Sequence, residues 1–421
     1  MKDLVIIGNS AAGISAAEAI RQKERESSIT IISDEGYNSY CRCLISYFLA
    51  GEIPEEKLVY RPDSFYKENN LNLILNKKVV KVEPKKNKVT LEDKASIGYD
   101  TLLIATGASP KFPSNLKGLQ KKGIFGLRTI KETKEILNLV PISSSSCVLG
   151  GGLIGLKAAY ALLKRKQELK VIVKSNFILS QMIDEKGSRL LMKKFQEAGV
   201  EIMAGHDIVE ILGNGDLKAV RLDNGKVIAS SILVVGKGVN PNINLIKDTQ
   251  LNLDKGILVD EYMKTNIPNI FAAGDVAQTF DIAYKNTAVN ALWPNAIEQG
   301  RVAGFNMIGE NLKYDGSMVM NSVEFFNLPV ISMGITRPKR PQLEELIFFD
   351  EKRNNYKKFV LDNNHLVGMI AVGDVRNCGV FLKLIKEGID ISSIKDELIS
   401  ETFNYAHILD LLKQRDEVYL V

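Results

Sequence analysis

Cysteine and histidine are scarce in this chain of 421 residues. Its four cysteines (Cys41, Cys43, Cys147 and Cys378) are too few and too scattered to form a disulfide framework. The three histidines lie far from one another in the sequence and near no cluster of cysteines. Because a zinc site needs several such ligands together, the sequence predicts no metal site.

Long apolar runs are also missing. No segment approaches the roughly 20 apolar residues that a membrane helix needs. The first residues lack the basic region and cleavage site of a secretory signal. We therefore expect a cytoplasmic protein without membrane association.

The chain also has only a small excess of charge of one sign. The net charge is +5 and the lysines are spread along the chain, which argues against nucleic-acid binding. Such a surface fits either an ordinary solvated, lysine-rich exterior or the docking of an acidic electron-carrier protein. With 45% hydrophobic and 25% charged residues, the composition is that of a globular protein, and the length suits two or three domains.

A βαβ unit is predicted at the start of the chain. Residues 4–7 read as a buried strand, the stretch to about residue 25 as a helix, and residues 29–32 as a second strand. The turn between the first strand and the helix follows the G-x-G-x-x-G pattern of dinucleotide-binding units. It consists of Gly8, Asn9, Ser10, Ala11, Ala12 and Gly13.

This turn predicts an FAD site. Gly8 permits the tight turn and Gly13 the close packing of helix on strand, while Ser10, in place of the second glycine, is still small. Backbone N–H groups at the helix start can then bind a pyrophosphate. An acidic residue at the end of the second strand binds the ribose in such sites, and either Asp34 or Glu35 fits that role.

A second βαβ unit follows about 140 residues later. A strand at 147–149 leads into a complete G-x-G-x-x-G pattern, a helix and a strand at 169–173, which predicts a nicotinamide dinucleotide site. Lys174 and Ser175 stand where NAD-specific sites usually carry a carboxylate. Lys174 either accepts the 2′-phosphate of NADPH or is a solvated residue, with Ser175 holding the ribose, so NAD(H) and NADP(H) both remain open. The residues of the pattern and of its helix start are Gly150, Gly152, Leu153, Ile154 and Gly155.

Further segments resemble the FAD-dependent pyridine nucleotide-disulfide oxidoreductase family. The nearest branch contains rubredoxin reductases, putidaredoxin-type ferredoxin reductases and the FAD part of nitrite reductase. Residues 101–108 are similar to the family's LLIATGA segment, residues 265–277 to its second FAD motif, and residues 40–46 to a stretch that passes the flavin. The resemblance implies contacts with FAD or NAD(P) at Arg42, Ala105, Thr106, Gly107, Arg128, Lys157, Gly236, Lys237, Gly238, Gly274, Asp275 and Trp293.

The same resemblance implies an α/β fold with two nested Rossmann-like domains of the glutathione-reductase type and a small C-terminal α+β domain. The expected FAD domain comprises residues 1–111 and 241–314, and the expected NAD(P) domain residues 112–240. Residues 315–421 are expected to form an interface or dimerisation domain, packed against the others because no low-complexity linker precedes it. We expect a homodimer or a subunit of a hetero-complex.

Two positions depart from the family pattern. Disulfide-reducing relatives carry a C-x₄-C pair, whereas Cys41-x-Cys43 is too short for that geometry and disfavours such a relay. Cys43 replaces a proline of the nearest branch, and it falls where thiol-dependent coenzyme A disulfide reductases and NADH oxidases have a single cysteine. It is either a redox thiol or a small buried side chain. Lys157 occupies a position where many relatives have a glutamate beside the nicotinamide.

The expected function is electron transfer between NAD(P)H and a one-electron protein carrier through FAD. The acceptor is rubredoxin, ferredoxin or the iron–sulfur subunits of a larger aldehyde or 2-oxoacid oxidoreductase. A thiol-dependent coenzyme A disulfide reductase or NADH oxidase that uses Cys43 is the enzymatic alternative. A flavin-binding scaffold or redox sensor without turnover is the non-enzymatic one.

Overall fold

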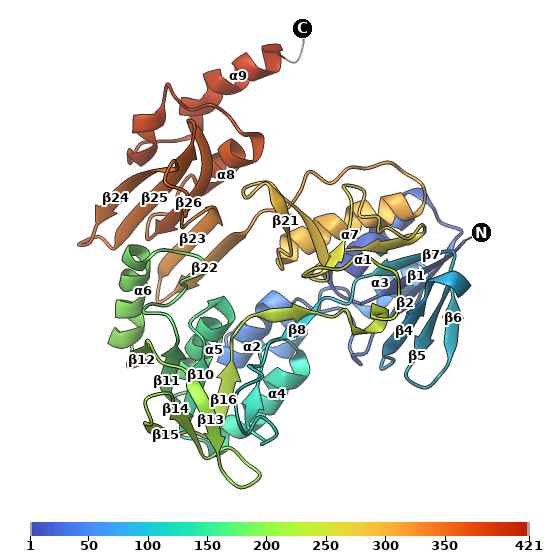
Figure 1. The fold of residues 1–421 in the computed structure, drawn as a ribbon, viewed down its shortest axis with the longest axis horizontal. Coiled ribbons are helices and arrows are strands. Elements are labelled where there is room, and N and C mark those ends of the chain that lie inside the picture. Colours follow the sequence, from blue (N-terminus) through green and yellow to red (C-terminus); the bar gives the residue numbers. More distant parts are fainter. Residues whose placement is uncertain (1, 419–421) are drawn as a thin grey trace.

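Three five-stranded sheets organise the computed structural model, which describes residues 2–418 (Figure 1). The first two sheets are parallel and the third is antiparallel. No helix within the described residues combines the length and the apolar character that crossing a membrane requires.

The first sheet has the order β19-β7-β1-β2-β3, with β1 at its centre. Buried β-branched and leucine side chains fill β1, β2 and β7, as expected for parallel strands covered on both faces. The strand β19 joins this sheet although the whole second sheet precedes it in the sequence. The strands are β1 (Asp3–Ile7), β2 (Ser28–Ile32), β3 (Leu71–Ile74), β7 (Thr101–Ile104) and β19 (Ile270–Ala272), and the small sheet beside them has β4 (Val79–Glu83), β5 (Lys88–Leu91) and β6 (Ser96–Gly98).

Two helices cross at very short range beside this sheet. A Cβ atom on Gly300 of α7 would lie 2.2 Å from the carbonyl oxygen of Ala12, and one on Gly304 would lie 2.4 Å from that of Ala16 in α1. Glycine is therefore required for this packing. The helices of this part are α1 (Ala11–Lys23), α2 (Ile45–Ala50), α3 (Asp63–Glu68) and α7 (Trp293–Met307), and its remaining strands are β18 (Ile257–Leu258), β20 (Ala277–Asp281) and β21 (Asn286–Ala288).

The second sheet repeats the design of the first, in the order β12-β11-β10-β16-β9. A three-stranded antiparallel sheet, β13-β14-β15, follows it in the chain. The elements are β9 (Ile124–Phe125), α4 (Ile130–Leu139), β10 (Ser145–Leu149), α5 (Leu153–Lys164), β11 (Glu168–Val173), α6 (Glu185–Glu197), β12 (Glu201–Ala204), β13 (Ile208–Leu212), β14 (Ala219–Leu222), β15 (Val227–Ala229) and β16 (Ile232–Val235).

The chain leaves the first sheet and returns to it side by side. The outgoing segment β8 (Ala108–Pro110) pairs antiparallel with the returning segment β17 (Val239–Pro241). This paired crossing lies between the two parallel sheets (Figure 1). It agrees with the expected nested arrangement, while the exact domain limits stay a prediction.

The third sheet has the order β22-β23-β26-β25-β24. Strands β24, β25 and β26 form an antiparallel meander, and the helix α8 follows it. The elements are β22 (Met320–Phe325), β23 (Leu328–Gly334), β24 (Glu344–Asp350), β25 (Asn355–Asp362), β26 (His365–Val372), α8 (Cys378–Glu387) and α9 (Leu409–Val418).

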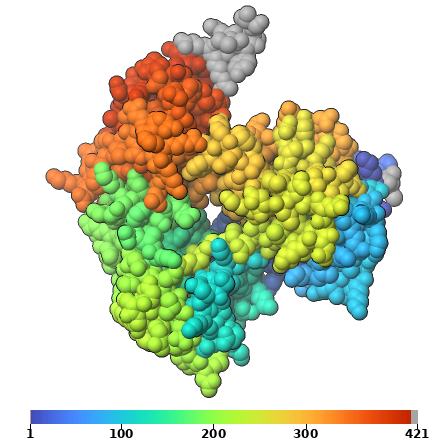
Figure 2. Space-filling view, in the orientation of Figure 1, coloured from blue at the N-terminus to red at the C-terminus, as the bar shows by residue number. Residues whose placement is uncertain are grey.

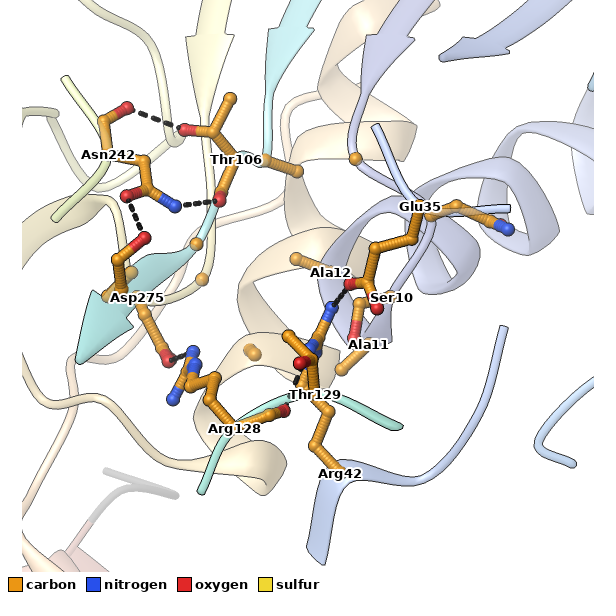
Figure 3. Close-up of a pocket in the computed structure, with 18 of the residues that line it drawn as sticks. Ser10, Ala11, Ala12, Glu35, Arg42, Thr106, Arg128, Thr129, Asn242 and Asp275 are labelled. Atoms are coloured by element: carbon orange, nitrogen blue, oxygen red, sulfur yellow. Dashed lines mark hydrogen bonds and ion pairs between the residues drawn. The ribbon is translucent and has the colours of Figure 1, made fainter. Parts of the chain in front are cut away.

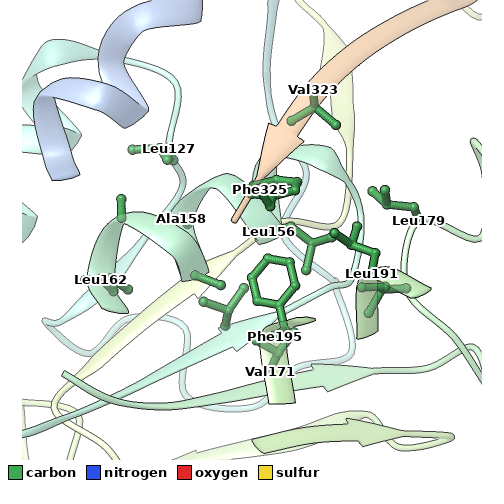
Figure 4. Packing of buried hydrophobic residues seen from close by; sticks show 14 of the residues in the cluster. Leu127, Leu156, Ala158, Leu162, Val171, Leu179, Leu191, Phe195, Val323 and Phe325 are labelled. Atoms are coloured by element: carbon green, nitrogen blue, oxygen red, sulfur yellow. The ribbon is translucent and has the colours of Figure 1, made fainter. Parts of the chain in front are cut away.

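The third sheet shares a core with the second. Val323 and Phe325 of β22 pack into a hydrophobic cluster with α5, α6 and β11 (Figure 4). The ring centroid of Phe325 lies 5.2 Å from that of Phe195, which is fully buried on α6. The C-terminal part is therefore packed against its neighbour, as the absence of a linker predicted.

Candidate functional site

A cavity of about 610 Å³ lies where the parts of the molecule meet, and Figure 2 shows the surface hollowed between them. Both predicted dinucleotide units contribute to its wall. Residues 7–12 come from the first glycine turn and the start of α1, and Leu153, Ile154 and Lys157 come from the start of α5. The paired crossing and the start of α7 complete the wall.

The first glycine turn allows no larger residue at its two glycines. Gly8 has φ +124°, and a Cβ on it would lie 2.1 Å from the carbonyl oxygen of Ala105. A Cβ on Gly13 would lie 1.9 Å from the carbonyl oxygen of Gly8. Ser10 begins α1 in an extended conformation and makes no side-chain hydrogen bond to the helix. The helix start therefore presents backbone to the cavity, which fits the binding of a pyrophosphate.

The second glycine turn has the same construction. Gly150 has φ +120°, and a Cβ on it would lie 2.3 Å from the carbonyl oxygen of Gly236. A Cβ on Gly155 would lie 2.1 Å from the carbonyl oxygen of Gly150. Gly152 begins α5 in an extended conformation. Two helix starts of one geometry thus reach the same cavity.

Glu35 takes part in a network of hydrogen bonds and an ion pair with Tyr40 and Arg42. It accepts a hydrogen bond from the Tyr40 hydroxyl at 2.6 Å and forms an ion pair with Arg42. Arg42 also donates to the Tyr40 hydroxyl and to the carbonyl oxygen of Arg128, each at 2.9 Å. Burial raises the pKa of Tyr40, so the hydroxyl keeps its proton and donates it to Glu35. Asp34, the other candidate for the ribose, lies exposed on the cavity wall.

A second cation, Arg128, lies next to Arg42 at the cavity (Figure 3). Arg128 donates to Asp275 at 2.5 Å, and Thr129 next to it begins α4 with a capping box. Asp275 follows Gly274, which has φ +81° and donates its N–H to Gln299 at 2.8 Å. Arg128 and Asp275, 147 residues apart, are thus held together at the cavity.

The paired crossing is fixed by an asparagine that the sequence did not single out. Asn242 donates from its side chain to the carbonyl oxygen of Thr106, and Thr106 Oγ1 donates to the carbonyl oxygen of Asn242, both at 2.9 Å. Ala105, Thr106 and Gly107 line the cavity beside it. Its only sequence signal was its place next to Pro241 at the expected return crossing.

Cys43, Lys157 and Trp293 also lie on the cavity wall. Burial lowers the pKa of Lys157. Trp293 begins α7 and packs edge-on against Tyr60, with 5.3 Å between the ring centroids. It is therefore both a packing residue and a lining residue.

The remaining predicted positions lie around the second sheet. Lys174 is exposed at the end of β11, and Ser175 Oγ donates to the carbonyl oxygen of Phe177 at 2.8 Å. Lys237 pairs with Asp207 at 2.9 Å. Gly236 packs against α5, since a Cβ on it would lie 2.8 Å from Cα of Gly155, and Gly238 has φ +90°. Among residues 2–418, no group of three or more histidine, cysteine, aspartate or glutamate side chains is placed to hold a metal ion.

The comparison with known families decides the classification. Residues 2–300 match the pyridine nucleotide-disulphide oxidoreductase model. The chain belongs to that family. Residues 320–389 match the C-terminal domain of rubredoxin NAD⁺ reductase. FAD and NAD(P)H are the cofactors of such enzymes, so the predicted family, fold class and cofactors are confirmed.

Individual relatives are similar over most of this chain. The nitrite reductase [NAD(P)H] of Bacillus subtilis is 32% identical over 93% of this chain, but this chain spans only 48% of that relative's length. The epsilon subunit of the NADH-dependent phenylglyoxylate dehydrogenase of Aromatoleum evansii is 29% identical over 94% of each chain. The solved NAD-dependent persulfide reductase of A. fulgidus has a TM-score of 0.87 and 25% identity, and the match covers 94% of this chain and 78% of that one.

Proposed function

We propose that the protein transfers electrons from NAD(P)H to a one-electron protein carrier, either rubredoxin, ferredoxin or an iron–sulfur subunit of a larger complex. The observation that carries this proposal is the single cavity reached by two helix starts of dinucleotide-binding geometry. The match of the C-terminal part to rubredoxin NAD⁺ reductase supports a protein carrier. The similarity to the epsilon subunit of a dehydrogenase supports a role for this chain as one subunit of a larger enzyme complex.

In this proposal, the residues of the chain bind and orient the two cofactors. We assign the FAD pyrophosphate to the N–H groups that begin α1, and the nicotinamide dinucleotide to those that begin α5. Because Glu35 is tied to Tyr40 and Arg42, Asp34 is the better candidate for the ribose. The positive end of α7 faces the cavity at Trp293, where it favours negative charge. Bound flavin would supply the chemistry, since it exchanges two electrons with NAD(P)H and one with a carrier.

The domain assignment is proposed with this function. Residues 1–111 and 241–314 would bind FAD, residues 112–240 NAD(P)H, and residues 315–421 would form an interface. The nested order of the sheets and the paired crossing support it.

Anaerobic reduction tests the proposal. The full chain, reconstituted with FAD, should lose its yellow absorbance on addition of NADH or NADPH, and added rubredoxin or ferredoxin should restore it. Asp275→Asn should raise the FAD dissociation constant about tenfold, a loss of about 1.4 kcal/mol, because Arg128 loses its charged partner. Asp248→Asn, exposed in a loop, is the matched control. A flavin that NAD(P)H reduces but no one-electron carrier reoxidises would overturn the proposal.

A thiol-dependent disulfide reductase or oxidase is the second candidate. It is favoured by one observation, the position of Cys43 on the cavity wall. The similarity to a persulfide reductase also supports this second function, because persulfide reduction is a reaction of sulfur. If disulfides but not carriers reoxidise the reduced protein, this second function replaces the first.

A further inference from the structure

The third sheet ends in a strand whose outer edge has no partner. This strand, β24, lies at the end of the sheet that is farthest from β22 (Figure 1), and within residues 2–418 it pairs with no strand other than β25. The 3₁₀ helix η6 (Lys395–Ile399) reaches its first residue, where Lys395 pairs with Glu344. The backbone N–H and C=O groups along the outer side of β24 therefore form a template for a further strand.

The features that usually protect such an edge are missing from β24. Protected edge strands are short, contain a bulge, or carry lysine or proline. By contrast, β24 spans seven residues, Glu344–Asp350, and its register with β25 runs without a shift. None of the seven is a lysine or a proline. The strand is therefore regular enough to accept another strand along its whole length.

Two apolar side chains of the strand are exposed. Ile347 is 40% exposed and Phe349 is 44% exposed. Because they are two residues apart in a strand, both lie on one face of the sheet. Phe349 packs edge-on against Tyr356 of β25, with 5.9 Å between the ring centroids. Electron transfer gives these two side chains no role, and exposed apolar residues on an edge strand favour pairing with another chain.

Each of the three acidic residues of the strand forms an ion pair with a cation. The pairs are Glu344 with Lys395, Glu345 with Lys358, and Asp350 with Arg353. Unpaired carboxylates on an edge would repel a second strand of the same sequence. Because a cation accompanies each carboxylate here, this repulsion is largely removed.

A second copy of the strand fits the edge in a register that uses all seven residues. In a symmetric dimer, two edge strands run antiparallel about a two-fold axis. With the axis at Ile347, this residue lies opposite Ile347 of the second copy, and Leu346 lies opposite Phe348. Glu344 then lies opposite Asp350, and each of these carboxylates already has its own cation. The strand is thus complementary to itself in both apolar character and charge.

We propose that two copies of this chain associate through β24, with the two strands antiparallel and centred on Ile347. The third sheets of the two copies then form one continuous sheet, with five strands from each copy. The pairing uses the same edge in both copies, so it closes at a dimer and does not extend into a fibre. It gives the interface proposed for residues 315–421 a surface and a partner. The inference is independent of the electron acceptor, because oligomeric state and flavin reduction are measured separately.

Sedimentation velocity of the full chain, reconstituted with FAD, tests the proposal at micromolar concentration. We expect the wild-type protein to be a dimer. Ile347→Glu should raise the dimer dissociation constant about tenfold, because it places two like charges opposite each other at the axis. In the monomer the new carboxylate would lie beside Lys358, its cross-strand neighbour, which favours folding.

Val227→Glu is the control for this substitution, since Val227 is a strand residue of β15 that is 51% exposed. This variant should remain a dimer. Monomeric wild-type protein, or an unchanged dissociation constant in Ile347→Glu, would overturn the proposal.

Cysteine cross-linking tests the register. Directly opposite residues of antiparallel strands have Cα atoms about 4.5–5.5 Å apart, within the range of about 4.4–6.8 Å that a disulfide spans. Ile347→Cys should therefore form a disulfide between the two copies on mild oxidation. Phe349→Cys is the matched control, on the same face and similarly exposed. In the proposed register its two copies are four residues out of line, about 13 Å along the strand.

Wild-type protein oxidised in the same way gives the background from the native cysteines. A covalent dimer of Ile347→Cys alone, seen on a non-reducing gel, is the expected result. Equal cross-linking of the two variants, or none in Ile347→Cys, would overturn the proposal.

Discussion

At the scale of single residues, the cations of the cavity are held by carboxylates. Arg42 is fixed by Glu35, and Arg128 by Asp275. A guanidinium held in this way keeps its orientation, which suits the recognition of phosphate or ribityl oxygens. Cys41 is held differently, by thiol and backbone donors and a nearby amine.

The reactivity of Cys41 should depend on pH in a way that an ordinary thiol does not. Its pKa is lowered to about 6, so its thiolate is present above that pH and is lost as the pH falls through it. Cys43, Lys157 and Tyr60 are the titratable groups that interact with it. Iodoacetamide labelling of peptide 26–42 should reach half its maximal rate near pH 6. A midpoint at the ordinary value of about 8.5 would contradict this assignment.

Lys174 should influence the choice of coenzyme. It is exposed at the end of β11, where a carboxylate would accept the ribose hydroxyls of NADH and repel the 2′-phosphate of NADPH. Lys174→Glu should therefore lower the ratio of kcat/KM for NADPH to that for NADH at least tenfold in steady-state assays. Lys186→Glu, exposed at the start of α6, is the control. An equal ratio in both variants would show that Lys174 does not contact the coenzyme.

At the scale of elements, the crossing of α1 and α7 positions the FAD site. Each helix begins at the cavity, and Gly300 and Gly304 let their backbones touch. The distance between the first glycine turn and the start of α7 therefore depends on two glycine positions.

Gly300→Ala should weaken FAD binding. Its new Cβ would lie 2.2 Å from the carbonyl oxygen of Ala12, so α7 must move away from α1. We expect faster release of FAD on dilution, by about tenfold, together with a lower melting temperature. Gly379→Ala in α8 meets no atom within 4 Å and should be neutral or stabilising by up to about 1 kcal/mol. Equal FAD release from the two variants would count against this role of the crossing.

At the scale of the whole molecule, one hydrophobic cluster joins all three parts. It contains Leu49 of α2, Val171 of β11 and Phe325 of β22. A polar link accompanies it, because Tyr356 of β25 donates to Asp184, the N-cap of α6, at 2.5 Å. The parts are therefore expected to unfold together.

Phe325→Ala should destabilise more than the C-terminal part alone. Removing a buried phenylalanine costs about 3–5 kcal/mol, and this side chain packs against Phe195 across the interface. Calorimetry should show a single transition, shifted to lower temperature. Phe280→Ala, 46% exposed, should change stability by less than about 0.5 kcal/mol. A second, separate transition in the wild-type protein would contradict the shared core.

The sequence by itself determined the two glycine turns and the strands of the two βαβ units. These features depend on local rules: glycine where a Cβ would meet backbone, and apolar runs where strands are buried. For that reason Gly8, Gly13, Gly150 and Gly155 were all recognised before the structure was known.

Only the tertiary structure decided which side chains share a neighbourhood. It paired Glu35 with Arg42, Arg128 with Asp275 and Thr106 with Asn242, and it brought Lys157 to the two cysteines. These contacts join segments that are distant in the chain, and their strength depends on burial and on distances of a few ångströms. Such quantities are set by the packing of whole elements, which no local pattern of residues records.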